Sequence, residues 1–443
     1  MVKEMNVVGK VKSRTKKTIR KIINFFKYEK IVDLNQSQWW SYDKLIDFQN
    51  RRLENIVAYA YENIPAYRKK FERARVTPED IRSIEDLSKL PITTREEMQD
   101  NQDFVNKDLV ARKLYTGGST GATLRYFESF ESGEIRWGVH LRGWRWNGYE
   151  HGKQKLAVVS SAQGVIEGEN TLNLLGDLSE LNIKKNLRKI LEFRPQYLRG
   201  YVSSLYILAN YCIDHNIKID FVESINPISE NLYDFQRESI EQAFGGKVFE
   251  EYCCNDGGAC AWECEAHEGL HYAMERAVIE EVNGEVIVTD LWNRAMPFIR
   301  YRNGDSVTFL KKECSCGRKL PLIKVKGRTN DILIGPKGPI SPTYVMHNWY
   351  DGSKYEENRE FRTGISLMQF IQKPNYELII NIVKNPNWTQ NMYREFEAAM
   401  RKTFVGMQMS INIVDFLEAT AKGKRHFIIN EDRELLKQWG YLR

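Results

Sequence analysis

The sequence has 443 residues, which is too long for one ordinary folding unit and predicts about three domains. Hydrophobic residues make up 42% of it and charged residues 28%, a composition that excludes a disordered or collagen-like chain. The net charge of +6 is too small for this length to indicate nucleic-acid binding by itself. No apolar run approaches the ~20 residues that span a bilayer.

The cysteines and the first residues together predict a cytoplasmic protein. Seven cysteines, an odd number in a large chain, argue against a disulfide framework and favour a reducing compartment. No uninterrupted apolar region follows the early lysines, so we expect no signal peptide.

Residues 1–30 differ in composition from the rest, because lysines and arginines alternate with valine, isoleucine and phenylalanine at about a helical period. This pattern predicts a basic amphipathic helix, and we assign residues 1–35 to it. Such a helix either lies on an anionic membrane surface, as a peripheral contact at its inner face, or packs its apolar stripe on the body of the protein. The pattern alone does not separate these two interpretations.

The chain then changes from a helical to an alternating pattern. Residues 37–108 are predicted to be helical, and Thr94 followed by Arg95, Glu96 and Glu97 is typical of a helix N-cap with acids in the first turn. Between residues 110 and 325, short β-rich runs alternate with helical ones, which predicts an α/β architecture. The predicted strands include Lys155–Ser160, Lys247–Glu250, Val286–Thr289 and Ser306–Phe309, and the predicted helices include Leu205–His215 and Leu232–Ala243.

A second change in composition near Gly327 indicates a small carboxy-terminal domain. Tyr376–Ile382, Gln390–Phe404 and Met409–Val414 form a strand–helix–strand pattern within it. We therefore predict a large α/β domain of several subdomains over residues 36–329 and a small α+β domain over residues 330–443. The two would join near residues 328–331.

A glycine-rich run is the sharpest local motif. Three glycines allow a tight turn and a close approach to a ligand, and the hydroxyl groups between them can donate to phosphate oxygens. Because no Gly-Lys-Ser/Thr follows, it is not a Walker A loop, and taken alone it also fits a plain β-hairpin. The run consists of Thr116, Gly117, Gly118, Ser119, Thr120 and Gly121.

The order of further motifs decides between these interpretations. The chain continues with Tyr301-Arg302-Asn303-Gly304-Asp305, then Gly327-Arg328-Thr329-Asn330-Asp331, then Gly423-Lys424-Arg425. This ordered set resembles the adenylate-forming superfamily, and within it the phenylacetate-CoA ligase group that includes the capsular-polysaccharide CapK-like proteins. The stretches 59–67, 89–94 and 199–204 are also similar to that group, so that the resemblance runs from about Asp47 to the end.

The resemblance implies activation of a small carboxylic acid by ATP in two steps. The acid attacks the α-phosphate to give an acyl adenylate and pyrophosphate, and the thiol of CoA or an amine then takes the acyl group. Ser119, Thr120 and the glycines would hold the pyrophosphate portion, Asp305 the ribose hydroxyls, and Arg328 the nucleotide. Lys424, on a small domain that rotates between the half-reactions, would bridge the carboxylate and the α-phosphate.

The sequence departs from this family in three places. The family pattern Tyr-Gly-x-x-Glu, whose glutamate holds Mg²⁺, is replaced by a run from Tyr252 to Asp256; aspartate still suits a hard cation but is one carbon shorter. Asn330 takes the place of the expected hinge acid, and Thr123 that of a proline after the glycine-rich run. These changes bear on metal geometry and efficiency more than on the class of reaction.

A separate set of residues predicts a structural zinc site. Cys314 and Cys316 form a tight pair, and Cys264 lies upstream with His267 and His271. Two close thiolates with a remote Cys and His match a closed tetrahedral site, although reduced thiols with no metal would fit the same spacing. The family resemblance favours His271 as the fourth ligand, with His267 as the alternate.

The acyl pocket is the part of the site that the sequence indicates least clearly. The resemblance places it near residues 203–206 and before Tyr252, and residues 257–259 either leave room for a ring or let strands pack closely. The remaining cysteines and Trp137, Trp144 and Trp146 fit pocket walls or core. Two other functions stay open: an amide-forming CapK-type ligase in surface-polysaccharide synthesis, and a nucleotide-binding protein that has lost catalysis.

Overall fold

A computed structural model describes residues 32–99, 101–115, 124–159, 170–174, 180–328, 333–336, 338–340, 364–418 and 426–438. The chain forms two compact units. The first comprises the described parts of residues 1–148, 252–303 and 309–324, and the second those of residues 149–251, 304–308 and 325–443. The helix predicted over residues 1–30 lies outside the described residues. The boundary predicted at residues 329–330 stays a prediction.

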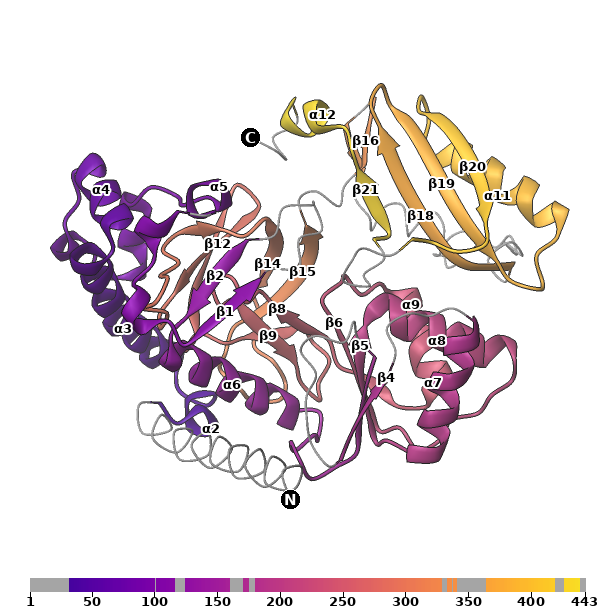
Figure 1. Cartoon of the computed structure of the whole chain (residues 1–443), viewed down its shortest axis with the longest axis horizontal. Helices are drawn as coiled ribbons and strands as arrows, with labels where there is room; N and C mark the ends of the chain where they lie inside the picture. The colour runs from indigo at the N-terminus through magenta and orange to yellow at the C-terminus, as the bar shows by residue number, and fades with distance from the viewer. Residues whose placement is uncertain are drawn as a thin grey trace, which may run out of the picture. The chain divides into compact units, whose positions relative to one another are not determined.

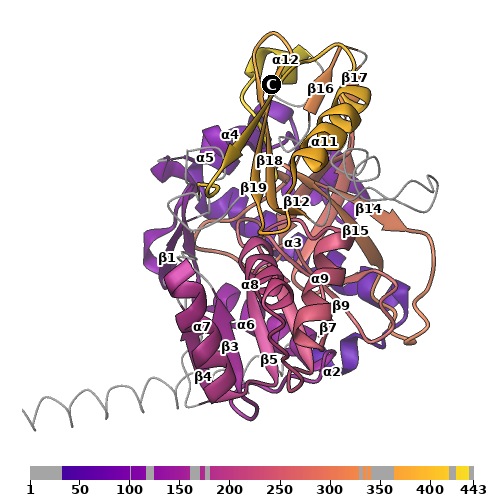
Figure 2. The ribbon, with the colours of Figure 1, turned by 90° about the vertical axis from the view of Figure 1, so that its right-hand side faces the viewer.

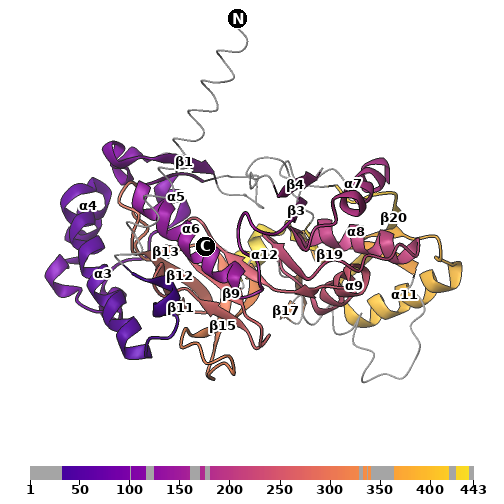
Figure 3. The ribbon, with the colours of Figure 1, turned by 90° about the horizontal axis from the view of Figure 1, so that it is seen from below.

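Helices form the amino-terminal part of the first unit, as the sequence predicted. α3 begins after Ser41, whose Oγ accepts a hydrogen bond from the Lys44 N–H at 3.4 Å, and it ends where Ile64 turns extended before Pro65. Pro65 then opens the next helix, α4, which lies next to α3 (Figure 3). The helices of this unit are α2 (Leu34–Ser37), α3 (Tyr42–Asn63), α4 (Pro65–Ala74), α5 (Arg95–Met98) and α6 (Phe130–Arg145).

Antiparallel strands build the rest of the first unit. One sheet has the order β14-β15-β10-β9-β8, another β11-β12-β13, and β1 pairs with β2. Asn283 and Gly284 both have positive φ between β11 and β12, which is the tight hairpin turn that an Asn-Gly pair favours. The strands are β1 (Arg112–Tyr115), β2 (Arg125–Glu128), β8 (Glu251–Cys253), β9 (Cys260–Glu263), β10 (Leu270–Tyr272), β11 (Ala277–Val282), β12 (Glu285–Asp290), β13 (Tyr301–Arg302), β14 (Asp305–Leu310) and β15 (Leu322–Arg328). Residues 251, 305–308 and 325–328 of these strands are counted with the second unit.

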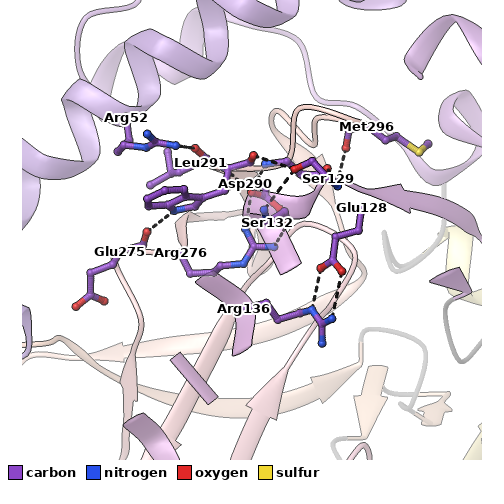
Figure 4. A network of polar contacts seen from close by, with 12 residues as sticks. Arg52, Glu128, Ser129, Ser132, Arg136, Glu275, Arg276, Asp290, Leu291 and Met296 are labelled. Atoms are coloured by element: carbon purple, nitrogen blue, oxygen red, sulfur yellow. Dashed lines mark hydrogen bonds and ion pairs between the residues drawn. The ribbon is translucent and has the colours of Figure 1, made fainter. Parts of the chain in front are cut away.

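Buried charged side chains connect α6 to the strands of the first unit through ion pairs and hydrogen bonds (Figure 4). Arg276 and Asp290 are each 1% exposed at the side chain and form an ion pair of 2.5 Å. Arg276 also donates to Ser132 Oγ of α6 at 3.0 Å, and Asp290 accepts from the backbone N–H groups of Trp292 and Asn293. The Arg276 charge is therefore paired with an opposite charge inside the protein, and both partners make further hydrogen bonds, which favours tolerance of buried ions.

A parallel sheet forms the first half of the second unit. Its order is β4-β3-β5-β6-β7, and all four residues of β3 are buried, as expected for a strand covered on both faces. Figures 1 and 2 show α7, α8 and α9 beside these strands, and the apolar residues of these helices share one core with them. The elements are β3 (Leu156–Val159), β4 (Thr171–Leu174), α7 (Glu180–Phe193), β5 (Tyr197–Tyr201), α8 (Val202–Asp214), β6 (Ser224–Ile228), α9 (Asp234–Phe244) and β7 (Lys247–Val248).

A second sheet, of order β20-β19-β18-β21, forms the carboxy-terminal half. β19 and β20 run parallel, with α11 between them in the chain, so the predicted strand–helix–strand pattern is confirmed. The elements are β16 (Leu333–Gly335), β17 (Gly338–Ile340), β18 (Ile365–Lys373), β19 (Glu377–Lys384), α11 (Gln390–Thr403), β20 (Gln408–Val414), β21 (Ile428–Asn430) and α12 (Arg433–Gln438).

The predicted α/β class is confirmed, with one correction among the strands. The strand predicted over Lys247–Glu250 was wrong in its extent, because β7 ends at Val248 and β8 begins at Glu251 in a different sheet. Within the part of the chain that the structure describes, no helix is both long enough and apolar enough to cross a membrane.

The Arg276–Asp290 pair gives the first prediction. Asp290→Asn keeps the size and the acceptor oxygen but leaves the Arg276 charge buried without its counter-ion, so we expect a loss of about 3–5 kcal/mol in the free energy of unfolding. Urea titration followed by circular dichroism measures it. Glu397→Gln, which breaks an exposed pair with Arg401 at 2.7 Å, is the matched control and should cost less than about 1 kcal/mol. Equal losses in both variants would contradict this account of the network.

Candidate active site

Two of the predicted motifs meet in the first unit. Tyr252 lies in β8 and Asp256 in the turn after it, while Tyr301 lies in β13 and Asn303 just beyond. The Tyr301 hydroxyl donates to Asp256 Oδ2 at 3.1 Å, and Asn303 Nδ2 donates to the Tyr252 hydroxyl at 3.1 Å. These two hydrogen bonds hold the turn after β8 against β13.

The stretch before Thr94 brings a third segment to the same place. The Thr93 N–H donates to the Arg300 carbonyl at 2.8 Å, and the Arg302 N–H donates to the Thr93 carbonyl at 2.9 Å, which forms a parallel bridge to β13. Thr94 then caps α5, as predicted, through reciprocal hydrogen bonds with Glu97. The bridge and the cap together fix the position at which α5 begins.

Arg95, the first residue of α5, supplies a positive charge to the site. Its Nη2 lies 3.6 Å from Asp256 Oδ2, and the two side chains are 17% and 10% exposed. The Cys254 thiol donates to the other carboxylate oxygen, Asp256 Oδ1, at 3.1 Å. Burial, followed by the nearby Asp256 charge, raises the pKa of Tyr301 well above its usual value, so Tyr301 stays a hydrogen-bond donor. Asp256 is thus held by groups from three segments of the chain.

The other predicted nucleotide-binding residues fall into two groups. Asp305 is buried at the start of β14, in the second unit, and Arg328 is the last residue of β15. Thr116, Gly117, Gly118, Ser119, Thr120, Gly121 and Lys424 lie outside the described residues. Their roles therefore stay predictions.

The glycines after Asp256 serve close packing. A Cβ added to Gly257 would lie 2.3 Å from a Val288 methyl group, and one added to Gly258 would lie 2.9 Å from the guanidinium carbon of Arg276. Both glycines also have positive φ, of 98° and 82°, which favours glycine. The space beside them is filled by neighbouring strands, so of the two interpretations of this run the close packing of strands is the one observed.

The residues predicted for the acyl pocket are buried in the second unit. Ser203, at the start of α8, donates through its N–H and its hydroxyl to Glu230 at 2.7 and 3.1 Å. Ser203 and Tyr206 line a cavity of about 40 Å³ with residues of β18, which has room for water but not for an acyl chain. The location of the acyl pocket stays a prediction.

The predicted zinc ligands come together in the first unit. The ligand atoms of Cys264, His271, Cys314 and Cys316 all lie within 4.8 Å of one another. The Cys264 and Cys314 sulfur atoms are 3.6 Å apart, and Cys316 Sγ is 3.3 Å from His271 Nε2. These separations are close to the ~3.5–3.8 Å between ligands that zinc bond lengths imply for a tetrahedral site.

The environment of His271 prepares it for this role. Its Nδ1 lies 2.9 Å from the Leu320 carbonyl, an acceptor, which assigns the proton to Nδ1 and leaves the Nε2 lone pair directed at Cys316. Burial lowers the pKa of His271, which favours the neutral imidazole that binds a metal. The alternate, His267, lies instead 3.2 Å from Glu263.

The thiols of the set differ in their electrostatics. Burial raises the pKa of Cys264 and of Cys314. Burial alone would also raise the pKa of Cys316, but hydrogen bonds from Arg318 outweigh it and lower that pKa. Arg318 itself pairs with Glu265 at 2.9 Å. Cys316 is therefore the thiol best prepared to ionise first.

Comparisons with known proteins bear on the whole chain. The family model described as the CapK C-terminal domain matches residues 357–431. Protein CapK of Staphylococcus aureus is 26% identical over 429 residues, covering 91% of this chain and 92% of that protein. A phenylacetate-coenzyme A ligase of Aromatoleum evansii is 24% identical over 436 residues, covering 90% and 97%. The predicted resemblance to the phenylacetate-CoA ligase and CapK group is confirmed.

The solved structures agree with this at the level of fold. A crystal structure of 2-hydroxyisobutyryl-CoA ligase in the postadenylation state, in complex with R3-HIB-AMP, superposes with a TM-score of 0.73 and 15% sequence identity. The match covers 91% of this chain and 93% of that one. The fold is therefore that of the adenylate-forming ligases, as the motifs of the phenylacetate-CoA ligase and CapK group predicted.

Two site residues were missed by sequence reasoning. Arg95 was assigned only to the first turn of a helix, and Tyr301 only to a motif, because their contacts with Asp256 join segments that are far apart in the chain. Nothing in the sequence indicated a role for Thr93 in the site, although it lies in a stretch similar to that of the phenylacetate-CoA ligase group.

Proposed function

We propose that the chain is an AMP-forming ligase that activates a small carboxylic acid with ATP and passes the acyl group to CoA. This class of enzyme is supported by the name of the phenylacetate-coenzyme A ligase of Aromatoleum evansii, which matches nearly the full length, and by a second phenylacetate-coenzyme A ligase that covers 68% of the chain. The observation that carries the proposal is the meeting of the Tyr252–Asp256 and Tyr301–Asn303 segments at one buried carboxylate.

The chemistry explains why such residues are needed. A carboxylate and a triphosphate are both anions, so fixed cations and N–H or O–H donors must neutralise the charge that develops as they join. In this proposal Thr116–Gly121 hold the phosphates, Asp305 accepts the ribose hydroxyls and Arg328 lies by the nucleotide. Lys424 supplies a compact positive charge between the two reacting groups.

The surroundings of Asp256 fit a magnesium ion that is held mainly by ATP. Each oxygen of Asp256 accepts one hydrogen bond, from Cys254 or Tyr301, and retains lone-pair capacity. Mg²⁺ usually takes one or two carboxylates together with phosphate oxygens, and when bound it neutralises phosphate charge. Arg95, Tyr301 and Cys254 hold the Asp256 carboxylate in position.

Two other functions are alternative candidates. The CapK C-terminal match over residues 357–431 favours, as the second candidate, an amide-forming ligase with an amine acceptor in surface-polysaccharide synthesis. The departures at Asp256 and Asn330 prompt the third, a nucleotide-binding protein without turnover. Pyrophosphate release screened over aryl, fatty and amino acids, with CoA or with amines, separates all three. If none of the acids in the screen supports pyrophosphate release, the third candidate is favoured.

Lys424→Ala tests the proposed catalytic charge. Loss of one positive group that stabilises the transition state should lower acid-dependent pyrophosphate release by about 10²–10³-fold, while ATP binding measured by calorimetry stays near that of the parent. Lys437→Ala removes another carboxy-terminal lysine, one that is half exposed and paired with Glu434, and should leave the rate unchanged. Equal rates in the parent and Lys424→Ala would refute the role of Lys424.

We also propose that Cys264, His271, Cys314 and Cys316 hold a structural zinc ion. Three thiol sulfurs and one imidazole nitrogen form the donor set of a closed tetrahedral site, and thiolates select zinc over harder cations. Because Cys264 follows β9, His271 lies in β10 and the other two precede β15, the ion would link strands that neighbour one another in one sheet. Its binding energy would then contribute to folding.

The two histidines supply a matched test of the zinc proposal. Protein purified without chelator should contain zinc that His271→Gln loses or binds more weakly and His267→Gln retains, since only His271 lies with the thiols. Elemental analysis measures the content, and thermal unfolding should show a lower midpoint for His271→Gln or after chelation. A metal-free parent of unchanged stability would end this proposal.

A further inference from the structure

A second group of soft ligands lies in the first unit, apart from the four predicted for zinc. His140 of α6, Cys253 at the end of β8 and Cys260 at the start of β9 each offer one ligand atom, and the three atoms lie within 4.8 Å of one another. His140 and Cys260 are buried, and Cys253 is partly exposed. The sequence reasoning had assigned the two cysteines to core or pocket lining.

The packing of α6 on β9 explains why His140 reaches the strands. A Cβ added to Gly143 would lie 2.4 Å from the ring of Trp262, so the absence of a side chain there lets the helix lie directly on β9. His140 is three residues before Gly143 and therefore on the same face of the helix. Its ring lies 5.2 Å from that of Trp262, edge to face.

The strand geometry supplies both thiols on the face under α6. Cys260 and Trp262 are two residues apart in β9, so their side chains lie on the same face. The Cys254 N–H donates to the Ala259 carbonyl at 2.8 Å across the turn, which places Cys253 opposite Cys260 on the neighbouring strand. The Cys254 thiol instead donates to Asp256.

We propose that His140, Cys253 and Cys260 form a second metal site, one that binds a thiophilic ion such as Zn²⁺ and leaves one coordination position open. Two thiolates and one imidazole are the donors that such an ion prefers, and the ligand atoms, all within 4.8 Å of one another, would approach to about 3.5–3.8 Å around the ion. Three protein ligands leave the fourth tetrahedral position for an external group, as in open zinc sites. The partly exposed side of Cys253 gives ion and external group a way in.

Metal stoichiometry tests this site without any assay of ligase activity. The full-length chain, freed of metal by chelator and kept under a phosphine reductant, is titrated with Zn²⁺, and with Co²⁺ to follow thiolate-to-cobalt absorption. Cys253→Ser/Cys260→Ser should bind one equivalent less than the parent, and His140→Gln should weaken that equivalent by about tenfold or more. Cys254→Ser, which changes the adjacent thiol directed at Asp256, is the matched control and should bind as the parent does.

The decisive quantity is the difference of one equivalent between the parent and the double variant, and it does not depend on the four-ligand site or on the proposed function. Equal stoichiometry in the two proteins would overturn the proposal. So would recovery of a Cys253–Cys260 disulfide peptide from parent protein that is alkylated without prior reduction, which would make this a redox pair of opposed strand residues. If the double variant unfolds, His140→Gln takes its place in the test. Its circular dichroism shows whether it is folded, and its cobalt spectrum is compared with that of the parent.

Discussion

The bridge between Thr93 and β13 is the contact on which the candidate site depends. It pairs backbone groups that are about 200 residues apart in the sequence, and it positions the first turn of α5. In this way it helps to place the Arg95 guanidinium 3.6 Å from the Asp256 carboxylate. Taking two charges largely out of water is favourable only when their geometry is fixed, and the bridge, the Thr94 cap and the Tyr301 hydroxyl together fix it. The position of the charged groups in the site thus depends on this backbone pairing.

Helix α6, which packs against β9, has a similar organising role. Its Arg142 forms a buried ion pair with Glu275 at 2.6 Å, and its Ser132 accepts from Arg276 in the network of Figure 4. These polar contacts at two points along α6 fix its rotation about its own axis, so that Gly143 faces Trp262. That rotation also decides where His140 points. A buried polar network here specifies orientation as well as contributing to stability.

Sequence reasoning succeeded where the chemistry is local. The Thr94 cap and the strand–helix–strand pattern around α11 depend on neighbouring residues, and both are present. The cysteine spacing predicted a four-ligand cluster, the family resemblance favoured His271 as its histidine, and the fold gives the physical reason for that choice. His271 lies in β10, which pairs with β15 beside the loop of the cysteine pair, whereas His267 adopts a positive φ in a turn. Arg95 and His140 gave no usable signal, because each acts through a contact with a distant strand.

Strand β9 connects the two cysteine-containing groups and explains how they can differ in behaviour. Cys260 begins the strand and Cys264 follows its end, four residues and about 13 Å apart along an extended chain. A closed site at Cys264 would anchor one end of β9, because all of its ligands come from the protein and its binding energy is part of folding. A three-ligand site at Cys260 would exchange its ion more readily through the partly exposed Cys253. Trp262, packed between them against α6, holds the strand whether or not the second ion is bound. If both proposals hold, the same strand would carry one metal that stabilises the fold and another that exchanges with the surrounding solution.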